Sequence, residues 1–200
     1  IGGDVGGPVQ RVSTAKEEAL GDITEDVLQS GKKLVVIARF IPEIKAICRL
    51  LEKKGIGYSL LMGGVKDREE QVAAFQNDPE VQVFVGQIAT AGLGVTLTAA
   101  STMVFYSLDY SMSNFEQAKA RIHRVGQREN CTYLYLTAKG TVDEKVLKAL
   151  RDKADLARML VDDCRSGLNP FAAGGGKART SKAGKCFNWP GSLRKSKNLR

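Results

Sequence analysis

The chain has 200 residues, of which 43% are hydrophobic and 26% charged, and this composition excludes a wholly disordered protein. No run of about 18 apolar residues occurs, so the sequence predicts no membrane span and no membrane partner. The net charge of +8 comes from residues 165–200, which hold nine Lys or Arg and no Asp or Glu, whereas the preceding 164 residues carry 21 basic and 22 acidic side chains.

The composition also predicts how the chain is divided. Residues 1–11 are rich in Gly and begin with Ile1 in place of Met, which indicates a severed connector in a fragment of a longer protein. From Arg165 onward Gly, Ser, Lys and Arg dominate, with too little apolar surface to offset the entropy of ordering. We therefore expect one folded domain over 12–164 and a basic, disordered tail over 165–200.

Between these ends, short apolar runs alternate with segments of helical period. The expected strands are 33–38, 58–62, 81–85, 102–106 and 131–136. Five helices are expected. One begins near Thr14, one carries the apolar stripe 44–51 and one covers 66–77. The last two begin at Ser113 and at Thr141, and the one from Thr141 ends near Val161. Glu17, Glu116 and Glu144 each follow a Ser or Thr by three residues, as in a capping box. The alternation predicts an α/β fold, a mainly parallel sheet of five or six strands with helices on both faces.

The cysteines give no sign of a metal or disulfide site. Their four positions, Cys48, Cys131, Cys164 and Cys186, lack the paired spacing of zinc or redox motifs. We expect no metal site, a reduced protein inside the cell, and small buried hydrophobic side chains at Cys48 and Cys131.

One loop at the expected ligand-binding edge of the sheet is unusual. Ligands of a parallel sheet bind at the carboxyl ends of its strands, and the loop after strand 81–85 contains Gly92 and Gly94. These glycines allow backbone amides to approach a phosphate or ribose, while Thr90, Thr96 and Thr98 offer hydroxyl groups. A tight turn between strand and helix is the alternative interpretation.

A helix expected over 113–127 carries the second candidate site. Steps of four and three place Gln117, Arg121 and Arg124 on one face, where two guanidinium groups can contact one phosphate. Ile122 and Val125 are expected on the opposite, buried side. A solvated basic face is the alternative.

These segments resemble a known family. QAKARIHRVGQ at 117–127 is similar to motif VI of the Swi/Snf-type ATPases, which are helicase-like DNA translocases of superfamily two, and ATAGLGVTLTAA at 89–100 is similar to their motif V. VVIARF at 35–40 resembles motif IV, and Gly63, Gly64 and Arg68 match the glycine and arginine positions after the second strand. The resemblance covers 30–163 and implies a RecA-like lobe.

The resemblance implies roles for individual residues. Arg121 and Arg124 would reach the γ-phosphate of ATP across a cleft, with Arg124 as the arginine finger. Gln117, Gly92 and Gly94 would lie beside the nucleotide. Contacts with nucleic acid would come from Arg39, Gly63, Gly64, Arg68, Thr90 and Thr96.

The sequence has no P-loop of the form Gly-x-x-x-x-Gly-Lys-Ser/Thr. In the resembling family the P-loop belongs to a first lobe, which would also hold most of the ATP and Mg²⁺. The chain is therefore expected to be the second lobe of an ATP-dependent motor on double-stranded DNA, inactive alone and partnered by the first RecA-like lobe of the same protein. A cytoplasmic protein of bacterial or phage origin is expected, or a nuclear one in a eukaryote. Two alternatives are a stand-alone DNA-binding or interaction module without ATPase activity and a lobe of an RNA helicase.

Overall fold

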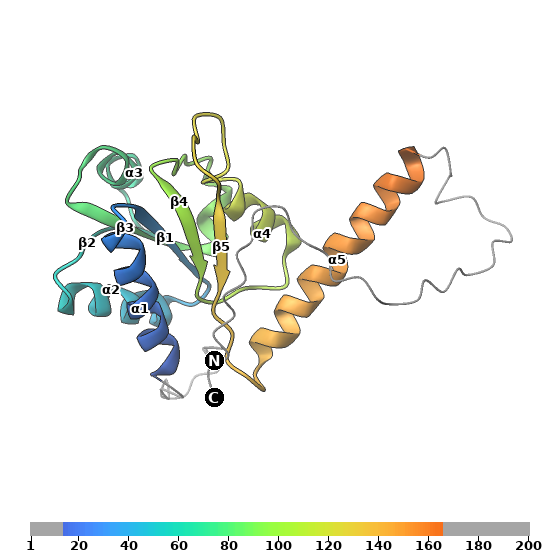
Figure 1. Cartoon of the computed structure of the whole chain (residues 1–200), viewed down its shortest axis with the longest axis horizontal. Helices are drawn as coiled ribbons and strands as arrows, with labels where there is room; N and C mark the ends of the chain where they lie inside the picture. Colours follow the sequence, from blue (N-terminus) through green and yellow to red (C-terminus); the bar gives the residue numbers. More distant parts are fainter. Residues whose placement is uncertain (1–13, 166–200) are drawn as a thin grey trace, which may run out of the picture.

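The computed structural model describes residues 14–165, which form a five-stranded parallel sheet with helices on both faces (Figure 1). In chain order the elements are α1 Ala15–Gln29, β1 Lys33–Ala38, α2 Ile41–Lys53, β2 Gly57–Leu61, α3 Arg68–Asn77, β3 Val81–Gln87, the 3-10 helix η1 Ile88–Leu93, β4 Ala100–Phe105, α4 Met112–Lys119, β5 Thr132–Tyr135 and α5 Val142–Arg165. The expected connector at 1–11 and the expected tail beyond Arg165 lie outside the described residues.

The sheet has the strand order β2-β3-β1-β4-β5, and every neighbouring pair is parallel. β1 is central, and Val36 pairs with Val85 on one side and Val104 on the other. Because both faces of β1 are covered, five of its six residues are buried, which is why the strand is a continuous apolar run. The predicted α/β fold with a parallel sheet is confirmed.

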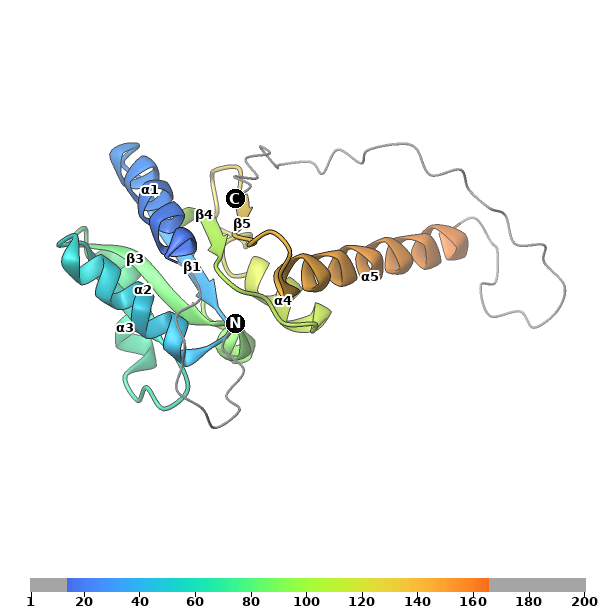
Figure 2. The same ribbon diagram turned by 90° about the horizontal axis from the view of Figure 1, so that it is seen from below.

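Two apolar cores cover the two faces of the sheet. On one face, Leu20 of α1 and Ile44 and Ile47 of α2 pack against side chains of the three central strands. On the other face, α3, α4 and α5 contribute buried side chains, and Phe75 of α3 meets Phe84 of β3 edge-on with ring centroids 5.4 Å apart. Figure 2 shows the same division from a second direction, with α1 and α3 on opposite sides of the sheet.

The predicted capping boxes are only partly present. At α1 the Thr14 hydroxyl donates to the Glu18 carboxylate at 2.9 Å and makes no side-chain cap. At α5 the Asp143 N–H donates to the Thr141 hydroxyl at 3.3 Å, while the Glu144 carboxylate accepts from Gly140 N–H. The first turn of each helix is thus stabilised by a different set of bonds from the one that the spacing alone suggests.

The predicted cap at Ser113 is wrong. α4 begins at Met112, and the Ser111 hydroxyl accepts from Asn114 N–H at 3.2 Å. The Asp109 carboxylate accepts from Ser111 N–H and from the Asn114 side chain at 2.9 and 2.8 Å. The helix starts earlier because Asp109 and Ser111 together satisfy donors that the helix itself leaves unpaired.

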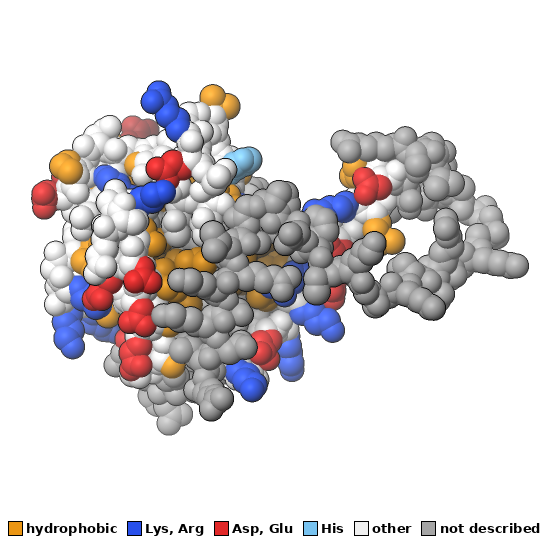
Figure 3. All heavy atoms as spheres, viewed as in Figure 1, with side chains coloured by type: hydrophobic (Ala, Val, Ile, Leu, Met, Phe, Trp, Pro, Cys, Tyr) orange, Lys and Arg blue, Asp and Glu red, His pale blue; other side chains and the backbone are white. Residues whose placement is uncertain are grey.

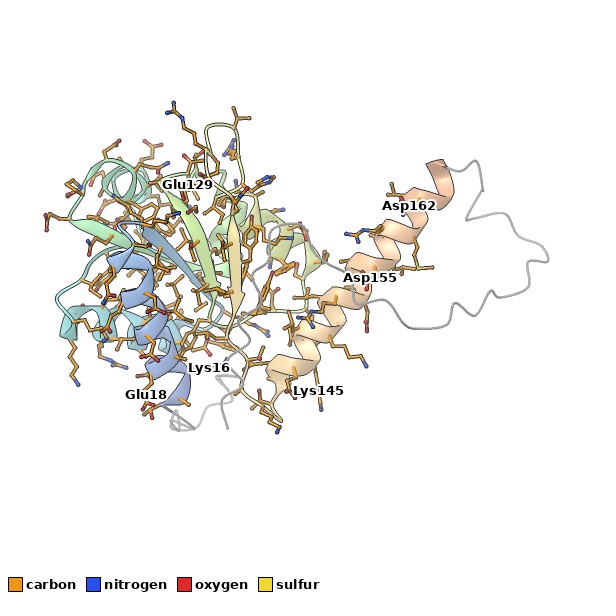
Figure 4. All side chains as sticks on the ribbon, in the orientation of Figure 1. Lys16, Glu18, Glu129, Lys145, Asp155 and Asp162 are labelled. Atoms are coloured by element: carbon orange, nitrogen blue, oxygen red, sulfur yellow. The ribbon has the colours of Figure 1, made fainter. Side chains whose placement is uncertain are left out.

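Charged side chains join the elements at the two ends of the sheet (Figure 4). Lys16 of α1 reaches Asp143 at 2.5 Å and the Tyr106 carbonyl at 3.0 Å, and Lys32 pairs with Glu129 at 2.5 Å.

At the start of β2, a Cβ on Gly57 would lie 2.0 Å from the Glu80 carbonyl oxygen, so only glycine allows this close approach of two strands.

The carboxyl half of α5 extends away from the sheet (Figures 1 and 2). Val146 and Leu150 anchor its first half in the core, whereas Leu156, Met159 and Val161 are at least half exposed. No helix within 14–165 is long and apolar enough to cross a membrane.

Candidate functional site

The carboxyl ends of the three strands β2, β3 and β1 are joined by one side chain. Gln87 lies at the end of β3, and its Oε1 accepts from Gly63 N–H at 3.1 Å while its Nε2 donates to the Arg39 carbonyl at 3.4 Å. The Thr90 hydroxyl, one turn further on, donates to the Gln87 carbonyl at 2.7 Å. These bonds bring Arg39, Gly63 and Thr90, three of the positions expected to contact nucleic acid, to one edge of the sheet.

A buried hydroxyl fixes the backbone of Arg39. The Ser107 hydroxyl accepts from Arg39 N–H at 2.8 Å and donates to the Glu43 carboxylate. The Arg39 side chain is exposed and its guanidinium lies 4.8 Å from the Phe40 ring centroid. The backbone at this edge is therefore rigidly held, while the charged group remains in contact with solvent.

Gly64 and Arg68 follow β2 on the way to α3. Gly64 has φ +91°, a left-handed conformation that favours glycine, and it is exposed. Arg68 is the first residue of α3, and its Nε donates to the Val65 carbonyl at 3.1 Å. One side of Arg68 lines an open hollow of about 480 Å³ between α3 and residues Gly94 and Val95.

A second cluster forms where the loop after η1 meets the residues after α4. Arg124 Nη1 donates to the Gly94 carbonyl at 3.1 Å and to the Thr96 hydroxyl at 3.0 Å. The Arg121 carbonyl accepts from Leu97 N–H at 2.9 Å. The structure therefore brings both arginines to the glycine-containing loop, from which they are more than 20 residues distant in sequence.

Thr96 belongs to this second cluster by its contact with Arg124, although the resemblance suggests a nucleic-acid contact. Gly92 lies within η1, and Gly94 follows η1 with φ +72°. The exposed Gln117 side chain lies on α4 and donates to the Ser113 hydroxyl at 3.0 Å. Among the described residues, no hydrogen bond joins the Gln117 side chain to either arginine.

The prediction of one helix over 113–127 that carries both arginines is wrong, because the helix ends earlier. α4 ends at Lys119, and residues 120–126 form consecutive turns. Ile122 is fully buried as expected, but Val125 is 99% exposed. A continued helix would use the carbonyls of Arg121 and Ile122 as acceptors for the N–H groups four residues later. Here Leu97 N–H and the Gln127 side chain take those two carbonyls, so the helix stops.

Gln127 holds the resulting turn, residues 120–126, against the start of β4. Its Nε2 lies 3.2 Å from the Ile122 carbonyl, 2.8 Å from the Ala100 carbonyl and 3.3 Å from the Thr98 carbonyl. Gly126 in this turn has φ +102°, which an L side chain rarely adopts. We call residues 120–126 the arginine turn.

The arginine turn places two guanidinium groups close together. Arg121 Nε is buried and has no hydrogen-bond partner within the described residues. Loss of hydration lowers the pKa of Arg121, and the neighbouring Arg124 charge lowers it further. An unpaired buried donor beside a second cation is costly in the free lobe, and an oxyanion placed there would satisfy it.

The acidic groups that a metal ion would need are not gathered here. No group of three or more His, Cys, Asp or Glu side chains able to hold a metal occurs in the described part of the chain. On the face shown in Figure 3, acidic and basic side chains are interspersed over the folded lobe. The described residues thus offer guanidinium groups and no acidic cluster at this site.

Several positioning residues carry no sequence signal strong enough to reveal them. Gln76 on α3 contacts Thr96 and Ala99, and Ser107 contacts Arg39, across 20 to 68 residues of sequence. An amide near a helix end or a serine after a strand is common on protein surfaces, so only the tertiary structure shows these contacts.

Comparisons with known proteins agree with this fold. The model of the helicase conserved C-terminal domain family matches residues 15–126. The chain is 31% identical over 152 residues to the chromatin-remodeling ATPase INO80 of Cryptococcus neoformans var. neoformans serotype D, which covers 75% of this chain and 9% of that protein. It is 30% identical over 150 residues to human INO80, covering 74% of this chain and 10% of the relative. The chain thus spans about a tenth of the length of these curated relatives.

A solved structure of the C-terminal part of the Fun30 ATPase domain superposes with a TM-score of 0.65. The two chains share 21% sequence identity, and the match covers 68% of this chain and 44% of that one, so it supports the fold. The family model matches more than half of the chain. The chain therefore belongs to the helicase conserved C-terminal domain family, as a carboxyl-terminal RecA-like lobe of the Swi/Snf helicase-like type.

Proposed function

We propose that this chain is the second lobe of an ATP-driven motor on double-stranded DNA, with Arg124 as its arginine finger and Arg121 as a second phosphate-binding group. The observation that carries the proposal is the arginine turn, where a buried guanidinium N–H that has no partner within residues 14–165 lies beside a second guanidinium. Such a cluster is satisfied by an oxyanion arriving from outside the lobe.

The part of ATP that the arginine turn could contact is its phosphate groups. The hydrogen bonds of the Arg124 side chain to Gly94 and Thr96 both use Nη1, and the side chain is exposed. Its remaining N–H groups can therefore donate to a γ-phosphate while the first nitrogen keeps the group oriented. Bound ATP supplies the phosphoryl group to be transferred, and Mg²⁺ would be held by a first lobe, since the described residues offer no acidic cluster.

We assign the nucleic-acid side to the edge formed by Arg39, Gly63, Gly64, Arg68 and Thr90. The exposed Arg39 guanidinium and the backbone amides of the glycine turn suit contacts with phosphates, which are independent of base sequence. Thr90 joins this edge to the loop that continues through Gly94 to Arg124. Closure of the two lobes would complete the ATP site and shift this edge along DNA in the same motion.

The relatives support a chromatin process for the whole protein. Those compared above are fungal and human proteins named as chromatin-remodeling ATPases. This likeness supports our proposal of a nuclear motor acting on chromatin, whereas the expected bacterial or phage origin and cytoplasmic location find no support among these relatives.

The proposal is tested by ATP hydrolysis of the full-length natural protein with and without double-stranded DNA. We expect Arg124→Ala to lower DNA-stimulated kcat by about a thousandfold or more, because the finger stabilises charge that develops in the transition state. Arg128→Ala is the matched control, since Arg128 is an exposed arginine four residues away.

ATP binding is measured in parallel by nucleotide titration, and it should survive in both variants. Equal kcat in the Arg124 and Arg128 variants would refute the finger. A full-length protein that binds DNA and hydrolyses no ATP would make the lobe a binding module, and stimulation by RNA alone would make it part of an RNA helicase.

A further inference from the structure

The Gln76 side chain forms a clamp that no part of the proposed function yet uses. Its Nε2 donates to the Thr96 carbonyl at 3.1 Å and lies 3.4 Å from the Thr98 hydroxyl, while its Oε1 accepts from Ala99 N–H at 2.8 Å. A single amide thus binds both a donor and an acceptor of the backbone that leads into β4.

The segment 94–99 needs such partners because it forms no helix or strand. A backbone without regular structure must pair its polar groups with other parts of the protein. Gln76 holds this segment from α3, and the arginine turn holds it from the other side through Leu97, Thr96 and Gly94. The Thr96 residue is shared, since its carbonyl contacts Gln76 and its hydroxyl contacts Arg124.

The helix that carries Gln76 is firmly anchored. Phe75, the preceding residue, is fully buried against the sheet. Arg68 begins the same helix, and at 1.5 Å per residue the two backbone positions lie about 12 Å apart along one rigid element. A displacement of the Arg68 end therefore reaches residue 76 without being absorbed by a flexible joint.

We propose that Gln76 is a positioning residue, which fixes Thr96 against α3 and thereby sets where Arg124 lies relative to the DNA-contacting end of that helix. This inference rests on the proposed function of Arg124 and Arg68. In this inference, a movement at the DNA-contacting end of α3 is passed through Gln76 to the nucleotide-contacting Arg124. This route is additional to the loop that joins Thr90 to Gly94.

The expected signature is a loss of kcat with little change in KM for ATP. A misplaced Arg124 fails to stabilise the transition state, whereas the nucleotide is held mainly by other groups. Displacements of about 1 Å can lower rates by about a hundredfold, so we expect a loss of about ten- to hundredfold for Gln76→Glu. Glutamate keeps the acceptor for Ala99 N–H and removes the donor to the Thr96 carbonyl.

The experiment measures kcat, KM for ATP and stimulation by double-stranded DNA in the full-length natural protein. The variants are Gln76→Glu, Gln76→Ala, Arg124→Ala and the double variant Gln76→Glu with Arg124→Ala. Asn77→Ala is the matched control, because Asn77 is an exposed amide whose side chain donates to Ala73 within α3. Thermal unfolding of each variant shows the fraction folded at the assay temperature, and Gln76→Ala replaces Gln76→Glu if the charge unfolds the lobe.

Support requires that the Gln76 variant lose kcat and DNA stimulation with KM changed less than about twofold, and that the double variant be no slower than Arg124→Ala alone. Independent, multiplying losses would overturn the positioning role, because a residue acting through Arg124 has nothing to position once Arg124 is removed. Wild-type kcat in Gln76→Glu would overturn it too, while leaving the finger intact. Wild-type kcat in Arg124→Ala refutes the proposed function itself and the positioning role with it.

Discussion

Replacing Arg121 by methionine should stabilise the folded lobe while removing a guanidinium group to which we assign phosphate binding. Arg121 Nε is buried and has no hydrogen-bond partner in the described part of the chain, and loss of hydration together with the Arg124 charge lowers the pKa of Arg121. Both effects disfavour the folded state, since the unfolded chain hydrates the same guanidinium. Methionine keeps an unbranched apolar stem of similar length and carries no donor to satisfy.

The magnitude follows from the one unsatisfied N–H. Leaving a buried donor unpaired costs about 1–3 kcal/mol, and the lower end applies here because Arg121 is only partly buried. We expect Arg121→Met to raise the free energy of unfolding by about 1 kcal/mol. For a domain of this size, that corresponds to an increase in Tm of about 2–4 °C.

Urea unfolding of the 200-residue chain, with Arg128→Met as the exposed control, measures the difference. Pyrophosphate should then make the wild type more stable than Arg121→Met. An anion that binds only the folded wild type adds about 1.4 kcal/mol to its free energy of unfolding at ten times the Kd. Sodium chloride at matched ionic strength controls for screening. An Arg121→Met chain that unfolds at lower urea than Arg128→Met would refute the argument that Arg121 is a strained, unpaired cation.

Two further predictions concern the core. Phe75→Ala should lower the free energy of unfolding by about 3–5 kcal/mol, because Phe75 is fully buried and packs on Phe84. Urea titration measures this loss beside the surface control Asn77→Ala. A loss as small as that of the control would contradict the prediction. Burial, and to a smaller extent the Glu116 charge, raises the pKa of Tyr135 from 10 to about 12, so the stability that it contributes is complete below pH 10 and is lost as the pH rises toward 12. Between pH 10 and 12 the free energy of unfolding of the wild type should fall by up to about 1.4 kcal/mol per pH unit more than that of Tyr135→Phe, as measured by urea unfolding. Free energies that fall in parallel for the two proteins would contradict the raised pKa of Tyr135.

The strands were predictable because their burial is local in sequence. β1 is a continuous apolar run, since both of its faces are covered, and its predicted bounds 33–38 are those observed. β3 runs to Gln87, two residues past its apolar stretch, because parallel pairing with β1 continues to Ala38. Backbone pairing extends a strand without regard to polarity, so hydrophobic patterns predict the middle of a strand better than its end.

The end of α4 was not predictable for a different reason. The motif 117–127 has the spacing of a helix, and its spacing correctly predicts that Ile122 is buried. The helix does not continue past this turn because Leu97 N–H captures the Arg121 carbonyl at 2.9 Å, whereas the Lys119 carbonyl still accepts from His123 N–H at 3.3 Å. Leu97 is more than 20 residues away in sequence, so periodicity contains no information about this contact.

This difference changes what the arginines depend on. On a continuous helix, the positions of Arg121 and Arg124 would be fixed by their own helical hydrogen bonds. In the arginine turn they depend on Thr96, Gln127 and, through the 94–99 segment, on Gln76. A helix would hold both guanidinium groups at one geometry in every state of the motor. A turn that is held by a side chain of α3 and by the loop after η1 can shift when those elements move, which is what the finger role that we propose for Arg124 would need.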